Sequence, residues 1–360
     1  FMDDTVDFLE EMPANVVKKV LQNADEGTRK TINQFLNYPE NSAGSLMTIE
    51  YVDLHDYFTV RKAMDYIRRT GIDKETVYTC YVIDDQRKLV GQVSLRKLII
   101  APESACIRDI MDTNIVSAVT TDDQEAVADD FRRYDLTSVA VCDKENRLVG
   151  IITIDDIVDV IQDENTEDIK KMAAIIPSDE DYMKTSVWSL VAHRLPWLML
   201  LMISATFTST IITHFETLLS GAVLLTAFIP MLMDSAGNSG SQTSVTVIRN
   251  LALGEIELRD WPRVLIKEIG VAVVSGAALA LVNFLRIIIF TNTSMMIAAV
   301  VSVTLFCTVI IAMIVGCLLP IGAKKLGFDP AVMASPMITT IVDACSLMIY
   351  FLIASTMLGL

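Results

Sequence analysis

The sequence is poor in the residues that most enzymes use for catalysis. Its 360 residues include three histidines, His55, His193 and His214, and none belongs to a recognisable catalytic triad or metal motif. The six cysteines form no CxxC pair, which excludes a zinc ribbon and gives no framework of disulfides. A Walker A loop is also absent, so the sequence gives no support for ATP-driven pumping. These absences predict that the chain is not an enzyme.

Charged residues are scarce in the second half of the chain. Residues 184–360 contain eight of the 45 acids and nine of the 29 basic residues. The first half therefore holds 37 acids and 20 bases and has a net charge of about −17. An acidic surface repels nucleic acid and attracts cations, so we expect no nucleic-acid partner. The alternative is that these acids serve solubility alone.

Long apolar runs fill the second half instead. A membrane-spanning helix needs about 20 mainly apolar residues. The sequence predicts five such spans, at 197–213, 219–251, 264–290, 296–320 and 336–358. Basic residues precede the first span and occupy the loops after the second and fourth. They are Arg194, Arg249, Arg259, Arg263, Lys267, Lys324 and Lys325. This asymmetry predicts a cytoplasmic N-terminal half and an external C-terminus, with membrane lipid around the spans.

The second span is interrupted by a polar segment, PMLMDSAGNSGSQTS, at Pro230–Ser244. Such a segment is accepted at membrane depth where it is buried in protein or lines a wet cavity. The alternative is tight packing of helices through the small residues, with Asn238 and Gln242 forming hydrogen bonds between helices.

Asp343 lies inside the fifth span, in PMITTIVDACSLMIYF, and Thr339 lies one helical turn earlier on the same face. A carboxylate at membrane depth is costly and marks a functional site by default. A protonated acid or a structural hydrogen bond is the alternative. No basic residue in the second or fifth span is placed to neutralise Asp343, so we expect a cation as its partner. If two subunits meet around an axis, their Asp343 carboxylates form an acidic ring, and such rings select cations. An oxygen lining suits Mg²⁺ but does not separate it from Mn²⁺, Co²⁺ or Ca²⁺.

Residues 42–163 contain an internal repeat. YVIDDQRKLVGQVSLRKLI (Tyr81–Ile99) aligns with AVCDKENRLVGIITIDDIV (Ala140–Val158), and SLMT (Ser45–Thr48) aligns with DIMD (Asp109–Asp112). Each copy predicts a strand, a polar turn, a second strand and a helix. This pattern resembles a tandem pair of cystathionine-β-synthase (CBS) domains, a module that usually senses nucleotides or metal. An inert spacer is the alternative.

We therefore expect an α/β cytoplasmic pair of CBS domains and an all-α transmembrane domain of five helices. A short helical remnant precedes them, because residues 1–40 carry apolar residues at helical spacing on both sides of Pro13. The acidic opening, Phe1 to Glu11, does not fit a signal peptide, and a first residue other than Met suggests a trimmed chain. The predicted boundaries are 1–41 for the N-domain remnant, 42–162 for the CBS pair, 163–193 for a linker helix and 194–360 for the pore domain.

Nearly the whole chain resembles the MgtE family of magnesium channels. Its most specific motifs are PMLMDSAGNSGSQ, LRDWPRV (Leu258–Val264) and GFDPAVMASPMITTIVD (Gly327–Asp343). The resemblance implies a homodimer in the plasma membrane, with a central pore lined by the second and fifth spans. Asp343 matches the pore aspartate that holds hydrated Mg²⁺, and Asn238 lies in the matching glycine-rich motif. Thr339 replaces a small apolar residue of some relatives and changes the pore lining.

The resemblance also implies regulatory Mg²⁺ sites among cytoplasmic acids and a linker that acts as a plug helix. The matching acids are Asp123, Glu125, Asp135, Asp156, Asp159, Glu164, Glu167, Asp168 and Asp329. Most of the family's N domain is absent, so sites shared with it are incomplete. Some relatives bind ATP between their CBS repeats, but no residues here match a nucleotide pocket, so ATP is unsupported as a cofactor.

These observations predict a Mg²⁺-selective channel that imports Mg²⁺ and closes when Mg²⁺ binds the acidic CBS and linker region. Divalent ions that bridge like-charged segments favour the compact state and shift the population towards it. Two alternatives stay open. One is a gradient-coupled divalent cation carrier or exporter with a CBS regulator, and the other is a membrane receptor for Mg²⁺ or nucleotide that transports nothing.

Overall fold

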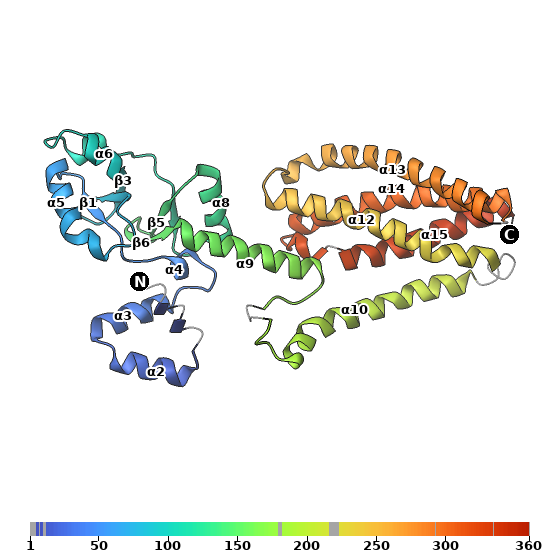
Figure 1. Ribbon diagram of the computed structural model, residues 1–360, viewed down its shortest axis with the longest axis horizontal. Coiled ribbons are helices and arrows are strands. Elements are labelled where there is room, and N and C mark those ends of the chain that lie inside the picture. The colour runs from blue at the N-terminus through green and yellow to red at the C-terminus, as the bar shows by residue number, and fades with distance from the viewer. Residues whose placement is uncertain are drawn as a thin grey trace. The chain divides into compact units, whose positions relative to one another are not determined.

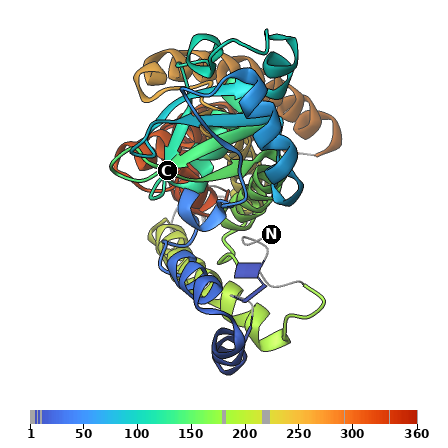
Figure 2. The same cartoon turned by 90° about the vertical axis from the view of Figure 1, so that its left-hand side faces the viewer.

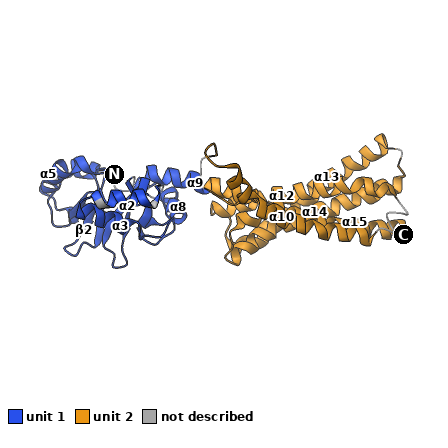
Figure 3. Cartoon of the chain, turned by 90° about the horizontal axis from the view of Figure 1, so that it is seen from below, with its two compact units in different colours: residues 1–164 blue, residues 165–360 orange. Residues whose placement is uncertain are grey.

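The computed structural model describes residues 5–6, 8–9, 12–178, 182–215, 223–291, 293–333 and 335–359. The chain divides into two compact units, unit 1 at Phe1–Glu164 and unit 2 at Asn165–Leu360, which Figure 3 shows in blue and orange. Unit 1 contains all the strands among the described residues, and unit 2 is helical. The expected fold class, a CBS pair combined with a helical membrane domain, is confirmed.

Unit 1 begins with three short helices, α2 (Ala14–Asn23), α3 (Glu26–Phe35) and α4 (Ala43–Leu46). The carboxylate of Asp25 accepts hydrogen bonds from the backbone N–H and the hydroxyl of Thr28, and it thereby starts α3. Phe35 and Ala43 are buried in the same apolar cluster as the second repeat, so these helices pack on it.

The two repeats fold alike, with a small sheet and helices beside it (Figures 1 and 2). In each sheet the first strand is parallel and the third strand antiparallel to the middle one, and each antiparallel pair has an irregularity at the equivalent place. The first repeat contains β1 (Asp53–His55), α5 (Val60–Thr70), η1 (Gly71–Asp73), β2 (Thr79–Ile83), β3 (Leu89–Ser94) and α6 (Leu95–Ile100). The second contains α7 (Ile107–Ile110), β4 (Ser117–Val119), α8 (Gln124–Tyr134), β5 (Ser138–Cys142), β6 (Leu148–Thr153) and α9 (Ile154–Met172).

Each repeat is completed by the segment that precedes the other one. Thr48 exchanges two backbone hydrogen bonds with Ile151 of β6, and Asp112 exchanges two with Gln92 of β3. The sulfur of Met47 occupies the space where Gly150 lacks a Cβ, and the sulfur of Met111 does the same at Gly91, each 2.5 Å from the position such an atom would take. These contacts explain why the glycine recurs in both LVG motifs and why a methionine recurs in both upstream segments.

Unit 2 is built around one central helix. α14 (Met295–Lys325) packs against α12 (Ile229–Ala252), α13 (Trp261–Phe290) and α15 (Ser335–Leu358), and α10 (Val187–His214) packs against α15. Three short 3₁₀ segments complete the unit, η2 (Val223–Phe228), η3 (Leu258–Asp260) and η4 (Pro330–Met333). Among the described residues, four helices are long and apolar enough to cross a membrane, at Val187–His214, Leu258–Phe290, Met295–Lys325 and Pro330–Leu358. α12 has 24 residues, or about 36 Å of helix, but its polar residues keep it out of this set.

The helix boundaries differ from the predicted spans in three places. α10 begins at Val187, ten residues before the predicted span, and continues through Pro196. α12 begins at Ile229, and residues 219–222 of the predicted second span lie outside the described residues. The polar segment at 230–244 does not interrupt α12, and no proline follows Pro230 within the helix. The hydroxyl of Ser239 donates to the carbonyl oxygen of Ser235, one turn back. α9 likewise continues from the second repeat into the expected linker, since no glycine or proline breaks it.

Candidate functional site

One face of α12 is held close to its neighbours by glycines. A Cβ on Gly316 of α14 would lie 2.2 Å from the carbonyl oxygen of Gly240, and a Cβ on Gly240 would lie 3.0 Å from that of Ala312. On α15, the methyl group of Thr339 lies 3.2 Å from the position of a Cβ on Gly237. Larger side chains at these positions would separate the helices. The glycines of the PMLMDSAGNSGSQTS motif therefore fix α12 against α14 and α15.

The other face of α12 is polar and exposed. Asp234, Asn238, Gln242, Thr246 and Arg249 follow one another at intervals of three or four residues, and all are exposed. Such spacing places them along one side of the helix, which we call the polar stripe. A polar stripe on a helix between apolar membrane helices requires water or another polar surface beside it. Close helix packing therefore explains the glycine face, and the polar stripe needs water or a second polar surface.

α15 places Thr339 and Asp343 one turn apart. The hydroxyls of Thr339 and Thr340 both donate to the carbonyl oxygen of Pro336, at 3.0 Å, so neither is an unsatisfied polar group. Asp343 is half-buried, and the charge that acts on it is that of Asp234 in the polar stripe. No described basic residue forms an ion pair with Asp343. Two acids therefore lie within electrostatic range of each other with no base between them.

Asp234 is the residue that the sequence reasoning missed. The polarity of its motif points to Asn238 as a site residue and does not single out Asp234. The missing signal was spacing, because Asp234 and Asn238 are four residues apart and share a helical face.

Glu167 and Asp329 are brought together by a lysine. The Nζ atom of Lys171 lies 2.6 Å from Oε1 of Glu167 and 2.8 Å from Oδ2 of Asp329. Burial lowers the pKa of Lys171, but the hydrogen bonds and charges of Asp329 and Glu167 outweigh it and hold the pKa above its usual value. The other carboxylate oxygen of Asp329 accepts a hydrogen bond from the N–H of Ala331, which fixes the loop before α15.

The remaining candidate acids have local partners or face solvent. Asp123 caps the start of α8, Asp135 caps its end in the left-handed conformation, and Asp156 accepts a hydrogen bond from the hydroxyl of Thr153. Oε1 of Glu164 accepts a hydrogen bond from Gln124 at 2.8 Å. Glu125 and Asp159 are exposed and Asp168 is half-buried. Within the described part of this single chain, no three His, Cys, Asp or Glu side chains form a group that could hold a metal ion.

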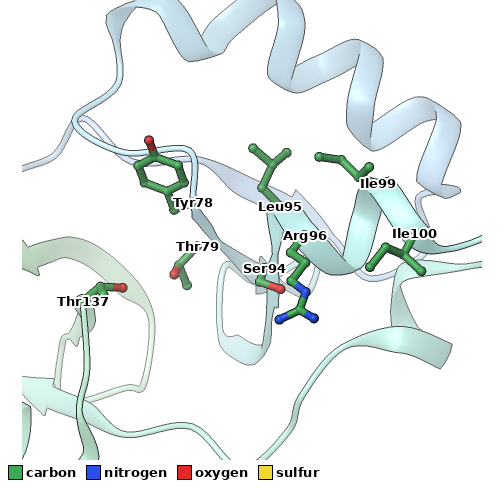
Figure 4. Close-up of a pocket in the computed structure, with 8 residues that line it drawn as sticks. All are labelled: Tyr78, Thr79, Ser94, Leu95, Arg96, Ile99, Ile100 and Thr137. Atoms are coloured by element: carbon green, nitrogen blue, oxygen red, sulfur yellow. The ribbon is translucent and has the colours of Figure 1, made fainter.

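Unit 1 also has an open cleft between its repeats, with a volume of about 580 Å³. Figure 4 shows its lining. The lining consists of Tyr78 and Thr79 at the start of β2, of Thr137 from the second repeat, and of residues at the end of β3 and in α6. These last residues are Ser94, Leu95, Arg96, Ile99 and Ile100. Arg96 is the charged residue in this lining. Sequence reasoning missed the lining of this cleft, because residues far apart in the chain form it.

Comparison with known families accounts for most of the chain. Residues 229–353 match the MgtE family, described as a divalent cation transporter, residues 43–104 and 107–163 match the CBS domain, and residues 1–41 match the MgtE intracellular N domain. The magnesium transporter MgtE of Thermus thermophilus is 36% identical, in a match that covers 99% of this chain and 80% of that protein. The chain belongs to the MgtE family of magnesium transporters. The MgtE protein of Bacillus subtilis is 35% identical, over 98% of this chain and 78% of its own length.

Two solved structures resemble part of this MgtE family member. A crystal structure of the soluble part of a magnesium transporter is 38% identical, with a TM-score of 0.45, and the match covers 46% of this chain and 64% of that one. The cytosolic domain of the Mg²⁺ channel MgtE in complex with ATP is 39% identical, with a TM-score of 0.43, over 44% of this chain and 65% of that one.

The polar stripe leads to a prediction about water access. We expect an Asn238→Cys variant in membranes to react with a charged, water-soluble thiol reagent at least about tenfold faster than a Val274→Cys variant, because a thiol reacts as its thiolate and needs water. Val274 is 72% exposed on α13 and is the lipid-facing control. The unsubstituted chain gives the background of its six native cysteines. Equally slow labelling of both variants would contradict a wet pathway beside α12.

Proposed function

We propose that this chain forms a homodimeric channel for Mg²⁺. The observation that carries the proposal is the acid pair, Asp343 and Asp234, which lies in the helical unit beside the polar stripe and has no described basic partner. A cation is the partner that compensates two such charges at membrane depth. Carboxylate, hydroxyl and amide oxygens are hard ligands, and Mg²⁺ retains several waters when it binds them. Asp343, Thr339 and Asn238 would then contact a hydrated ion rather than a bare one.

A second copy of the chain supports this geometry. The polar stripe of one copy is exposed, and the residues described in one chain offer no group of three metal ligands. A twofold axis beside α12 and α15 would place two polar stripes face to face and bring four acids around one pathway. Rings of acidic side chains select cations over anions.

The distribution of basic residues supports the orientation. Arg194, Arg249 and Lys324 all lie near helix ends on the side where α12 and α14 end, together with the η3 loop that carries Arg259. The positive-inside rule assigns this side to the cytoplasm. The acidic unit 1 would then be cytoplasmic and the C-terminus external, so that Mg²⁺ moves towards the acidic unit.

Closure by Mg²⁺ is the regulatory part of the proposal. Acids of α8, α9 and the loop before α15 carry like charges that repel without counterions. Each divalent ion that joins two of these segments binds the compact state better, and it therefore shifts the population towards the closed state. A channel and a gradient-coupled carrier differ in one measurement, since single-channel currents support the channel and strict dependence on a Na⁺ or H⁺ gradient supports the carrier. Intact metal binding without any flux would support a receptor.

Flux measurements test the pore. In liposomes, an Asp343→Asn variant should take up Mg²⁺ at least about tenfold more slowly than the unsubstituted chain. The amide keeps the shape of the side chain but removes the charge that holds the ion. Glu255→Gln is the matched control, since Glu255 is an exposed acid of the same unit beyond the end of α12. Undiminished uptake by the Asp343→Asn variant would remove this residue from the pathway.

Limited proteolysis tests closure. Millimolar Mg²⁺ should slow the tryptic cleavage of unit 1 in the membrane-embedded protein by about threefold or more, because a compact state opens less often to the protease. A monovalent salt at the same ionic strength is the control for screening. Cleavage at the same rate in both salts would contradict closure by Mg²⁺.

The cleft between the repeats suits a nucleotide as a modulator. Arg96 is positioned for a phosphate, and the exposed ring of Tyr78 offers a face to a base. ATP bound there would act on the acidic unit without entering the pathway.

Binding of a fluorescent ATP analogue tests this cleft. An Arg96→Ala variant should bind the analogue about tenfold more weakly, because it loses a charge-assisted hydrogen bond to phosphate. Arg61→Ala is the control, since Arg61 lies on α5 and is not part of the lining of the cleft. Its side chain is 77% exposed and makes one long ion pair, with Glu103, at 3.9 Å. Equal affinities of the two variants would rule out the cleft as the nucleotide site.

A further inference from the structure

The end of α9, from Asn165 on, belongs to unit 2 and makes three contacts of different kinds with the rest of that unit. Lys171 joins Glu167 on its own helix to Asp329 in the loop before α15. Met172 packs against Ile248 of α12 and Ala331 of η4.

The third contact is a hydrogen bond between the polar stripe and α9. Nη1 of Arg249 donates to Oδ1 of Asn165, at 3.1 Å. All three contacts lie within the last two turns of α9 and within unit 2. Each of the three contacts joins protein groups directly.

The lysine contact is the one that resolves a charge conflict. Glu167 and Asp329 are each 36% exposed, and without a cation their like charges would repel across the contact. The ammonium group of Lys171, at 24% exposure, lies within 2.8 Å of an oxygen of each acid. A single tethered cation thus supplies what a divalent ion would otherwise supply between the same two carboxylates.

We propose that Lys171 is a built-in cation that docks the end of α9 on the loop before α15 in the absence of divalent ions. The inference rests on the proposed closure by Mg²⁺, because it concerns two of the acids assigned to that closure. Closure would then involve two sets of contacts. The contact held by Lys171 is permanent, and the contacts between the other acids depend on bound ions. The Mg²⁺ dependence of this chain would then lie mainly in unit 1.

Hydrogen exchange at the end of α9 tests the inference in the full chain, in nanodiscs and in a chelating buffer. In a Lys171→Met variant, the backbone amide hydrogens of residues 166–176 should exchange at least about fivefold faster than in the unsubstituted chain. Without the lysine, Glu167 and Asp329 repel each other and separate α9 from the loop before α15. Millimolar Mg²⁺ should restore slow exchange in the variant and change little in the unsubstituted chain. A Lys171→Arg variant should exchange slowly without Mg²⁺, since it keeps the charge.

Lys325→Met is the matched control, because Lys325 is an exposed lysine at the end of α14 in the same unit, and its exchange pattern in α9 should not change. Slow exchange in the Lys171→Met variant without divalent ions would overturn the inference. Fast exchange that Mg²⁺ does not restore would also overturn it, because lysine and Mg²⁺ would then not share the two acids. Mg²⁺ uptake by the Asp343→Asn variant is measured separately, so a failure of the pore and a failure of the lysine contact are distinguished.

Discussion

A carboxylate inside an apolar helical bundle is stable as an anion only if water, a base or a cation compensates its charge. Asp343 lies within electrostatic range of a second acid, Asp234, and no described base pairs with it, so its ionised form needs water or a cation. The architecture of unit 2 follows from this constraint. Glycines allow one side of α12 to pack closely against α14 and α15, and this packing leaves the polar side of the helix exposed. The same motif thus combines close helix contacts with a polar surface.

Much of this structure could be predicted from the sequence, since periodicity and repetition are local signals. The two repeats were predicted from their aligned LVG motifs, and the long apolar runs predicted the helices of unit 2. Helix ends were predicted less well, because α10 begins nearly three turns before its apolar run and α12 continues through polar residues. The roles of the acids could not be read from the sequence. Asp123 and Asp135 cap a helix, and the meeting of Glu167 with Asp329 depends on segments far apart in the chain.

The acidic residues are distributed differently in the two units. Unit 1 carries most of the acids, and they are spread over separate elements rather than gathered in one metal site among the described residues. In the proposed closure an ion must therefore draw elements together in order to bind, which couples binding to a change of conformation. Unit 2 carries few acids, but two of them lie close together within the helical bundle. In the proposed function, one unit would thus respond to the concentration of an ion that the other unit would conduct.

The exchange of segments between the repeats has a consequence for how such a protein can evolve and fold. Met47 and Thr48 cover the sheet of the second repeat, and Met111 and Asp112 cover the sheet of the first. Neither repeat is a self-sufficient building block, because each lacks its own cover. A gene fragment that encodes one repeat alone would leave a strand edge bare, and such an edge recruits another chain. A pair of repeats is therefore the smallest unit of this fold in which both sheets are covered.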